Sequence, residues 1–249
     1  MNLVIPAVLP ASRKELEEKL ALLTQISGVS RIQIDVVDGK FAAPASWPYS
    51  AEATQGTPYT APAELQAMIA KGEMLPQLDR VEYEIDLMCR DALSAAAAWV
   101  AQGATRLTFH AESVSDLPRL LASARGRFGA GAGFASNLIS FGLALNIGSD
   151  LALIEPCLNE IAYVQFMGIA RIGRQAEPFD ERVLEKVRVF RVRHPKFPMQ
   201  VDGGVSLANA KQLVALGVGN LVVGSGILRA SDPASAIAAF EALQSPYGV

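Results

Sequence analysis

The sequence predicts an α/β protein folded as a single-domain TIM barrel, (β/α)8, that spans residues 1–249. Short apolar segments rich in β-branched residues alternate with amphipathic segments along the whole chain, as in parallel strands joined by helices. Eight such pairs are expected, and eight pairs in about 250 residues match the size of a barrel. The composition, 51% hydrophobic and 19% charged, is typical of a well-packed globular chain.

The first half of the chain contains four of the expected strands, at residues 3–9, 32–37, 81–88 and 105–110. Helices are expected from Ser12, which has Glu15 at the capping-box spacing, and at 63–71, 90–102 and 114–124. Residues 42–62 form a long irregular segment that is functional or mobile. Its aromatic residues, Trp47, Tyr49 and Tyr59, are interpreted as a lid or, equally, as a subunit contact.

The second half contains the other four strands, at 140–146, 162–169, a segment ending at Asp202, and 220–223. Helices are expected at 150–156, 180–192, 206–216 and 233–243, with loops at 170–178 and 224–226. A doubly wound sheet is the competing fold, but neither GxGxxG nor GxxxxGK[ST] is present, so no nucleotide cofactor is expected. The GAGAG run at 129–133 is interpreted as a flexible loop.

Several classes of partner are excluded by charge and composition. The formal net charge is −3 and no basic block occurs, so neither nucleic acid nor an anionic membrane surface is expected. The two cysteines, Cys89 and Cys157, form no CxxC pair, which favours reduced thiols. The N-terminal apolar run lacks the basic lead of a signal peptide, and no run is long enough to span a bilayer. We therefore expect a cytoplasmic protein.

Two carboxylates stand inside or at the end of apolar strands. Asp35 interrupts a β-branched run, and Asp202 ends the seventh strand immediately before two glycines. Burying an ionised carboxylate costs several kcal/mol unless a cation, a metal or hydrogen-bond donors meet it. Because active sites of barrels lie at the carboxyl ends of the strands, these residues predict a site between them.

Other polar or adaptable side chains are expected at the same end of the barrel. Residues two apart on a strand share a face, so Gln33 accompanies Asp35 and Glu84 accompanies Asp86. The whole expected set is Gln33, Asp35, Glu84, Asp86, His110, Asn146, Met167 and Asp202.

Two glycine turns follow the last two strands: Gly203-Gly204 and Gly224-Ser225-Gly226. Barrels commonly hold a phosphate at this position, on backbone N–H groups and a helix N-terminus. The alternative is that such turns simply favour glycine, but two of them on neighbouring strands indicate a phosphate site.

Eight stretches resemble the ribulose-phosphate 3-epimerase family, in family order and over nearly the whole chain: VIPAVLPAS, QIDVVDGKF, EIDLM, TFHAES, GLALN, VQFMGI, QVDGGVS and VVGSGI. The resemblance implies proton transfer at C3 of a phosphorylated ketopentose through an enediolate, with Asp35 and Asp202 as base and acid on opposite faces. It also implies a homo-oligomer. Substrate and phosphate contacts are expected from Met88, His110, Asn146, Met167, Arg171, Gly173, Arg174, Gly203, Gly204, Gly224 and Ser225.

The chain departs from the family at the metal. Two histidines that the family uses as ligands correspond here to Gln33 and Asp86. With Asp35 and Asp202 these residues form an all-oxygen set, which favours Mg²⁺ or Mn²⁺ over Zn²⁺ or Fe²⁺. Asp86 is interpreted equally as a ligand or as a structural residue, and His110 as a positioned or packing residue rather than a base.

Other departures concern the first strand and the lid. Ala7 stands where the family has a small polar residue, and the glycine-rich lid after strand six is replaced by ARIGRQAEP. Arg171 and Arg174 in that loop are interpreted as anion ligands or as a solvated face.

Three functions remain open at this point. The first is an epimerase-like isomerase, and the second is a phosphosugar-binding barrel that is non-catalytic or has altered specificity. The third is a magnesium-dependent lyase. A lysine at the end of a strand would favour it, but none is found there, and Lys40 lies just past the second strand.

Overall fold

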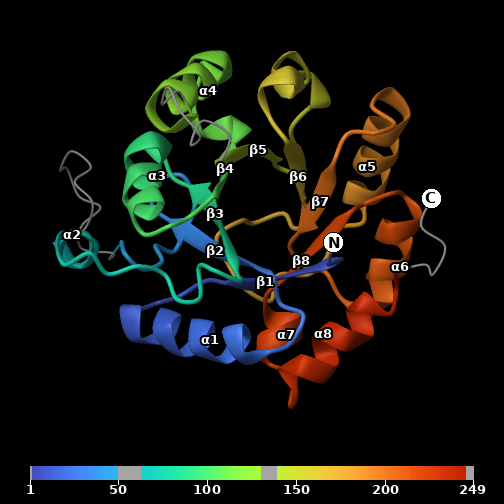
Figure 1. The fold of residues 1–249 in the computed structure, drawn as a ribbon. Helices are drawn as coiled ribbons and strands as arrows, with labels where there is room; N and C mark the ends of the chain where they lie inside the picture. Colours follow the sequence, from blue (N-terminus) through green and yellow to red (C-terminus); the bar gives the residue numbers. More distant parts are fainter. Residues whose placement is uncertain (1, 50–62, 130–138, 245–249) are drawn as a thin grey trace.

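The computed structural model describes residues 2–49, 63–129 and 139–244. Its strands form a closed barrel in the order β1 to β8, and every neighbouring pair is parallel, including β8 with β1. Figure 1 shows the strands at the centre and the helices around them. The predicted (β/α)8 barrel is confirmed. Within the described ranges, no helix is long and apolar enough to cross a bilayer.

The strands agree with the predicted segments to within two or three residues at each end. They are β1 (Val4–Val8), β2 (Arg31–Val37), β3 (Glu82–Met88), β4 (Arg106–His110), β5 (Ser140–Leu145), β6 (Tyr163–Met167), β7 (Met199–Asp202) and β8 (Asn220–Val223).

The α-helices surround this barrel: α1 (Arg13–Gln25), α2 (Ala63–Ala70), α3 (Ala92–Ala101), α4 (Leu117–Ala124), α5 (Arg182–Arg193), α6 (Leu207–Ala215), α7 (Ser225–Leu228) and α8 (Pro233–Glu241). Ser12 caps α1 as predicted, its side chain accepting from the Glu15 N–H. Short η2 (Ala111–Ser113) and π-helical η3 (Arg125–Gly129) flank α4.

Two predicted elements were wrong. In place of one helix at 150–156, the chain forms two 3₁₀ segments, η4 (Leu151–Leu153) and η5 (Glu155–Glu160). Pro156 has no N–H to continue a helix that begins at 151. In place of a loop at 224–226, α7 begins at Ser225, because the Gly224 carbonyl accepts from the N–H groups of Ile227 and Leu228.

The strands face two different environments. Their outward side chains join the main apolar core beneath the helices, with Ile34, Ile85, Phe109 and Phe166 fully buried there. Their inward side chains are largely polar, and the register places Gln33 beside Glu84, Asp35 beside Asp86 and Gln165 beside Gln200. The barrel interior is therefore a buried polar layer that ends at the candidate site.

The segment after β2 is partly described. Trp47 is only 5% exposed, packs edge-on against Trp99 with ring centroids 5.8 Å apart, and donates its indole N–H to Glu64. Its interpretation as a lid or a subunit contact was wrong, because it belongs to the core. Tyr49 packs against the same core, while Tyr59 and residues 130–133 of the GAGAG run lie outside the described residues.

Candidate active site

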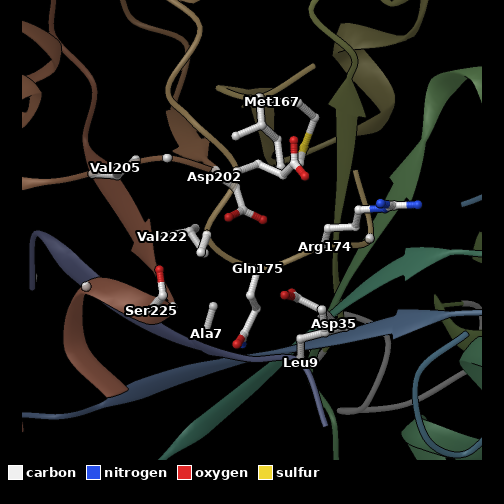
Figure 2. Close-up of a pocket in the computed structure, with 18 of the residues that line it drawn as sticks. Ala7, Leu9, Asp35, Met167, Arg174, Gln175, Asp202, Val205, Val222 and Ser225 are labelled. Carbon is white, nitrogen blue, oxygen red and sulfur yellow. The ribbon is translucent and has the colours of Figure 1, made fainter. Parts of the chain in front are cut away.

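A cavity of about 240 Å³ opens at the carboxyl ends of the strands, and Figure 2 shows the side chains around it. Ten of the predicted site residues line it: Asp35, Met88, Met167, Gly173, Arg174, Asp202, Gly203, Gly204, Gly224 and Ser225. The cavity wall does not include the predicted residues Gln33, Glu84, Asp86, His110, Asn146 and Arg171.

Three aspartates converge beside this cavity. Asp35, Asp86 and Asp202 each offer a carboxylate oxygen, and these oxygens lie within 4.8 Å of one another. Asp35 and Asp202 line the cavity, whereas Asp86 is fully buried behind them. Such a cluster can hold a divalent cation through oxygen ligands.

Two glutamine amides contact the aspartates. Gln33 Nε2 donates to Asp35 Oδ1 at 2.8 Å and to Asp202 Oδ2 at 2.9 Å, while its own Oε1 is buried without a partner. Gln165 Nε2 donates to Asp86 Oδ2 at 3.1 Å and lies 3.4 Å from Asp202 Oδ2. Rotating the Gln33 amide would turn its oxygen toward the carboxylates, so the residues present fit a hard cation held by three carboxylates and one amide oxygen.

Burial governs the ionisation of this cluster. Burial and the neighbouring charge of Asp86 raise the pKa of Asp35 to about 7. Burial and the charges of Asp35 and Asp86 raise the pKa of Asp202 well above its usual range. Like charges this close oppose one another's ionisation, so either a bound cation or protonation must relieve the repulsion.

His110 lies behind Asp86 rather than in the cavity wall. Its Nε2 is 3.0 Å from Asp86 Oδ1, and the Phe41 ring covers it with centroids 5.3 Å apart. Burial lowers the pKa of His110, but the charge of Asp86 and their hydrogen bond outweigh it and raise the pKa overall. The contact is that of a residue that orients Asp86.

The two glycine turns form the far wall of the cavity. Gly203 and Gly204 adopt φ values of +102° and +67°, and a Cβ on Gly204 would lie 2.6 Å from Phe179 Cα. Only glycine fits this tight passage into α6, whose first turn is closed by the Ser206–Asn209 capping box. Ser225 is the first residue of α7, which follows the neighbouring strand β8, and both glycine turns line the same cavity.

The loop at 170–178 covers the mouth. Ile172 packs on the small apolar cluster of Val37, Ala42 and Met88, so the loop reaches from β6 to the segment after β2. Arg174 Nε donates to the Ala43 carbonyl at 3.1 Å, and its guanidinium points away from both aspartates (Figure 2). Arg171, 67% exposed, pairs with Glu177 at 3.0 Å. Each of these contacts uses only the Nε–H of its guanidinium, so the other N–H groups remain able to bind an anion.

Asn146 lies just past the end of β5. Its N–H donates to Glu112 Oε1 at 2.8 Å, and its carbonyl accepts from Lys186 Nζ at 2.6 Å. These contacts tie it to the loop after β4 and to α5, away from the cavity wall.

Sequence reasoning missed four residues. Gln165 and Gln200 are two positions before Met167 and Asp202, so the same alternation that selected Gln33 and Glu84 would have found them. Gln175 and Glu177 line the cavity from the loop at 170–178. Nothing in the spacing of that loop indicated which of its side chains point inward.

The fold and the site together define a (β/α)8 barrel with an acidic cavity at the carboxyl ends of its strands. Residues 63–228 match the family model of the "Ribulose-phosphate 3 epimerase family", which is two thirds of the chain. The chain belongs to this family.

Similarity to two curated proteins agrees with this family assignment. The chain is 26% identical to the ribulose-phosphate 3-epimerase of Aquifex aeolicus, over 93% of this chain and 92% of that protein. It is 26% identical to the Mycobacterium bovis ribulose-phosphate 3-epimerase, over 95% of this chain and 90% of that protein.

Two solved structures share the fold at lower identity. KGPDC from Streptococcus mutans is 17% identical with a TM-score of 0.63, over 98% of this chain and 97% of that one. A 3-hexulose-6-phosphate synthase is 21% identical with a TM-score of 0.58, over 98% of this chain and 100% of that one.

Proposed function

We propose that this chain is an isomerase of the ribulose-phosphate 3-epimerase type, acting at C3 of a phosphorylated ketopentose. The observation that carries the proposal is that Asp35 and Asp202 open into the same cavity, with the two glycine turns on its wall. Inverting one carbon requires a proton to leave from one face and return to the other, and two carboxyl groups on either side of the substrate perform both transfers.

The electrostatics support an acid–base pair. Burial raises the pKa of Asp35 to about 7 and that of Asp202 well above its usual range, so these carboxyl groups exchange a proton closer to neutral pH than exposed aspartates do. Because like charges this close oppose one another's ionisation, one carboxyl can keep its proton while the other is ionised, which provides an acid and a base in the same site. The glycine turns, with Ser225, orient the substrate through its phosphate.

The donor set supports a hard metal. Asp35, Asp86, Asp202 and the rotated amide of Gln33 would hold Mg²⁺ or Mn²⁺ in preference to Zn²⁺ or Fe²⁺. When bound, such an ion stabilises the negative charge that develops on the substrate oxygens.

A second candidate is a phosphosugar-binding barrel without turnover. The observation that favours it is that Gln33 and Gln165 already supply hydrogen-bond donors to all three aspartates. Those donors compensate the buried carboxylates without any cation.

Proton exchange at C3 of ribulose 5-phosphate in deuterated water, followed by NMR, tests the proposal. The enzyme is measured after chelation and again with Mg²⁺, Mn²⁺, Zn²⁺ or Fe²⁺. We expect exchange and xylulose 5-phosphate formation with Mg²⁺ or Mn²⁺, and loss of product in Asp35→Asn and in Asp202→Asn.

Asp150→Asn is the matched control, because Asp150 is exposed and only caps η4. Exchange without product in one aspartate variant would assign the return of the proton to that residue. No exchange with any metal, while inorganic phosphate still protects the protein from unfolding, would select the second candidate. The homo-oligomer stays a prediction, which light scattering in solution tests.

A further inference from the structure

A network of buried, hydrogen-bonded polar side chains runs through the barrel interior beneath the aspartates. Gln165 on β6 pairs in register with Gln200 on β7, and Glu84 on β3 pairs with Arg106 on β4. Gln165, Gln200 and Glu84 are all at most 1% exposed. None of these residues lines the cavity, so their contribution to the site must pass through the residues that they touch.

At one end of this network, Glu84 forms an ion pair with Arg106. Glu84 Oε2 accepts from Arg106 Nε at 3.1 Å, and Glu84 Oε1 accepts from Thr108 Oγ1 at 3.0 Å. A carboxylate paired with a guanidinium only accepts hydrogen bonds. Gln200 must therefore present its nitrogen to Glu84, and Nε2 lies 2.5 Å from Glu84 Oε1.

This anchor fixes the amide of Gln165. Gln200 Nε2 also donates to Gln165 Oε1 at 2.7 Å, which uses the oxygen end of that amide. The nitrogen end is then turned toward Asp86 Oδ2 and Asp202 Oδ2, at 3.1 and 3.4 Å. Rotating Gln165 would bring two nitrogens together at Gln200 and two oxygens together at the aspartates.

Gln33 differs from Gln165 in this respect. Its Oε1 is buried with no partner, so rotation of its amide breaks only the two hydrogen bonds to Asp35 and Asp202, and a cation held by those carboxylates would replace them. Of the two glutamines beside the aspartates, one can change from donor to ligand and the other is held as a donor.

We propose that Gln165 is a positioning residue that fixes the carboxylates of Asp86 and Asp202, and that Gln200 and the Glu84–Arg106 pair fix Gln165 in turn. The inference rests on the proposed function of Asp202 and deepens it. A group that orients a metal-binding or catalytic carboxylate affects metal affinity or turnover by roughly 10- to 100-fold when it is lost. Because Gln165 is outside the cavity wall, its loss leaves substrate binding unchanged.

The test compares Gln165→Met and Gln165→Glu with the wild type. Methionine keeps the length of the side chain without the amide, and glutamate keeps its shape but replaces the donor by an acceptor. Gln102→Met is the matched control, because Gln102 is equally buried but its amide has no partner in the structure. Circular dichroism selects conditions in which every variant is folded.

The readouts are kcat and KM with ribulose 5-phosphate, and Mn²⁺ affinity from the EPR signal of the free ion. We expect kcat or Mn²⁺ affinity to fall by roughly 10-fold or more in Gln165→Met, at unchanged KM. Gln165→Glu should be at least as impaired, and Gln102→Met should match the wild type. A role in packing alone predicts instead that Gln165→Glu, which keeps the shape, is the milder variant, and that result overturns the proposal.

The failure of the proposed function is a separate outcome. A wild-type protein that neither binds Mn²⁺ nor exchanges the C3 proton removes the proposed function. A crystal structure of Gln165→Met then decides the role of Gln165 by itself. Displaced carboxylates of Asp86 and Asp202 support positioning, and unmoved carboxylates overturn it.

Discussion

The side-chain amide of Gln33 bridges Asp35 on its own strand and Asp202 on β7, donating to the two carboxylates at 2.8 and 2.9 Å. An amide can offer either end to its neighbours: its nitrogen compensates the carboxylates, and its oxygen can join them around a cation. The orientation of Gln33 and the presence of a cation are therefore linked.

A divalent metal should stabilise the folded protein. Three carboxylates share one buried site, so a cation that binds only the folded state relieves their repulsion and raises the melting temperature. At a free concentration about 100 times Kd, the gain in unfolding free energy is about 2.7 kcal/mol. Differential scanning fluorimetry with Mg²⁺ or Mn²⁺ after chelation measures it. Asp86→Asn should reduce the shift and Asp150→Asn should not; stabilisation by Zn²⁺ alone would contradict the predicted preference.

The chelated protein should lose stability as the pH rises from about 4 to about 7. Asp35 is surrounded by Gln33, Asp86, Glu84 and His110, and its pKa is raised from 3.8 to about 7. Within that window the folded state binds more protons than the unfolded state, so the unfolding free energy falls with increasing pH.

Replacing this carboxyl by an amide removes that dependence. Asp35→Asn should melt at a higher temperature than the wild type at pH 8 and lose this advantage at pH 4. Melting curves in chelator across that range test the sign. A variant that is less stable than the wild type at pH 8 would show that the carboxylate is compensated in the folded state.

Gly204→Ala should damage both folding and phosphate binding. The residue has φ +67°, and an added Cβ would lie 2.6 Å from Phe179 Cα and 2.7 Å from its nitrogen, which are backbone atoms. We expect a loss of roughly 1–3 kcal/mol of unfolding free energy from the strained backbone. Protection by inorganic phosphate, measured by urea denaturation, should weaken as well. Gly148→Ala is the control, since a Cβ there meets nothing within 4 Å.

Ser46→Ala tests the support of the strand that carries Asp35. The buried Ser46 hydroxyl accepts from the Val37 N–H at 2.9 Å and donates to the Asp35 carbonyl at 3.1 Å. Leaving these buried groups unpaired costs about 1–3 kcal/mol. Chemical denaturation measures the loss, with the exposed Ser30→Ala as control. Equal stability of the two variants would mean that water replaces the hydroxyl.

The sequence alone was sufficient to predict the fold and to predict which residues share a strand face with the aspartates. Apolar periodicity determines which segments become parallel strands, and an alternation of two places Gln33 with Asp35 on one face. The same alternation places Gln165 with Met167 and Gln200 with Asp202 on the inward face. Pro156 and the Gly224 carbonyl account for the two elements that were wrong.

Only the tertiary structure decided which of these residues meet the cavity and in which direction their hydrogen bonds run. The alternation of side chains identifies which face of a strand a residue occupies, but not how deep in the barrel the residue lies. Asp86 and His110 were therefore expected at the mouth of the barrel, but they are buried behind the cavity wall. Long side chains in loops have many rotamers. Contacts with Ala43 and Glu177 hold the guanidinium of Arg174 away from the aspartates and keep Arg171 out of the cavity wall. The orientation of Gln165 depends on Gln200, Glu84 and Arg106, which only closure of the barrel brings together.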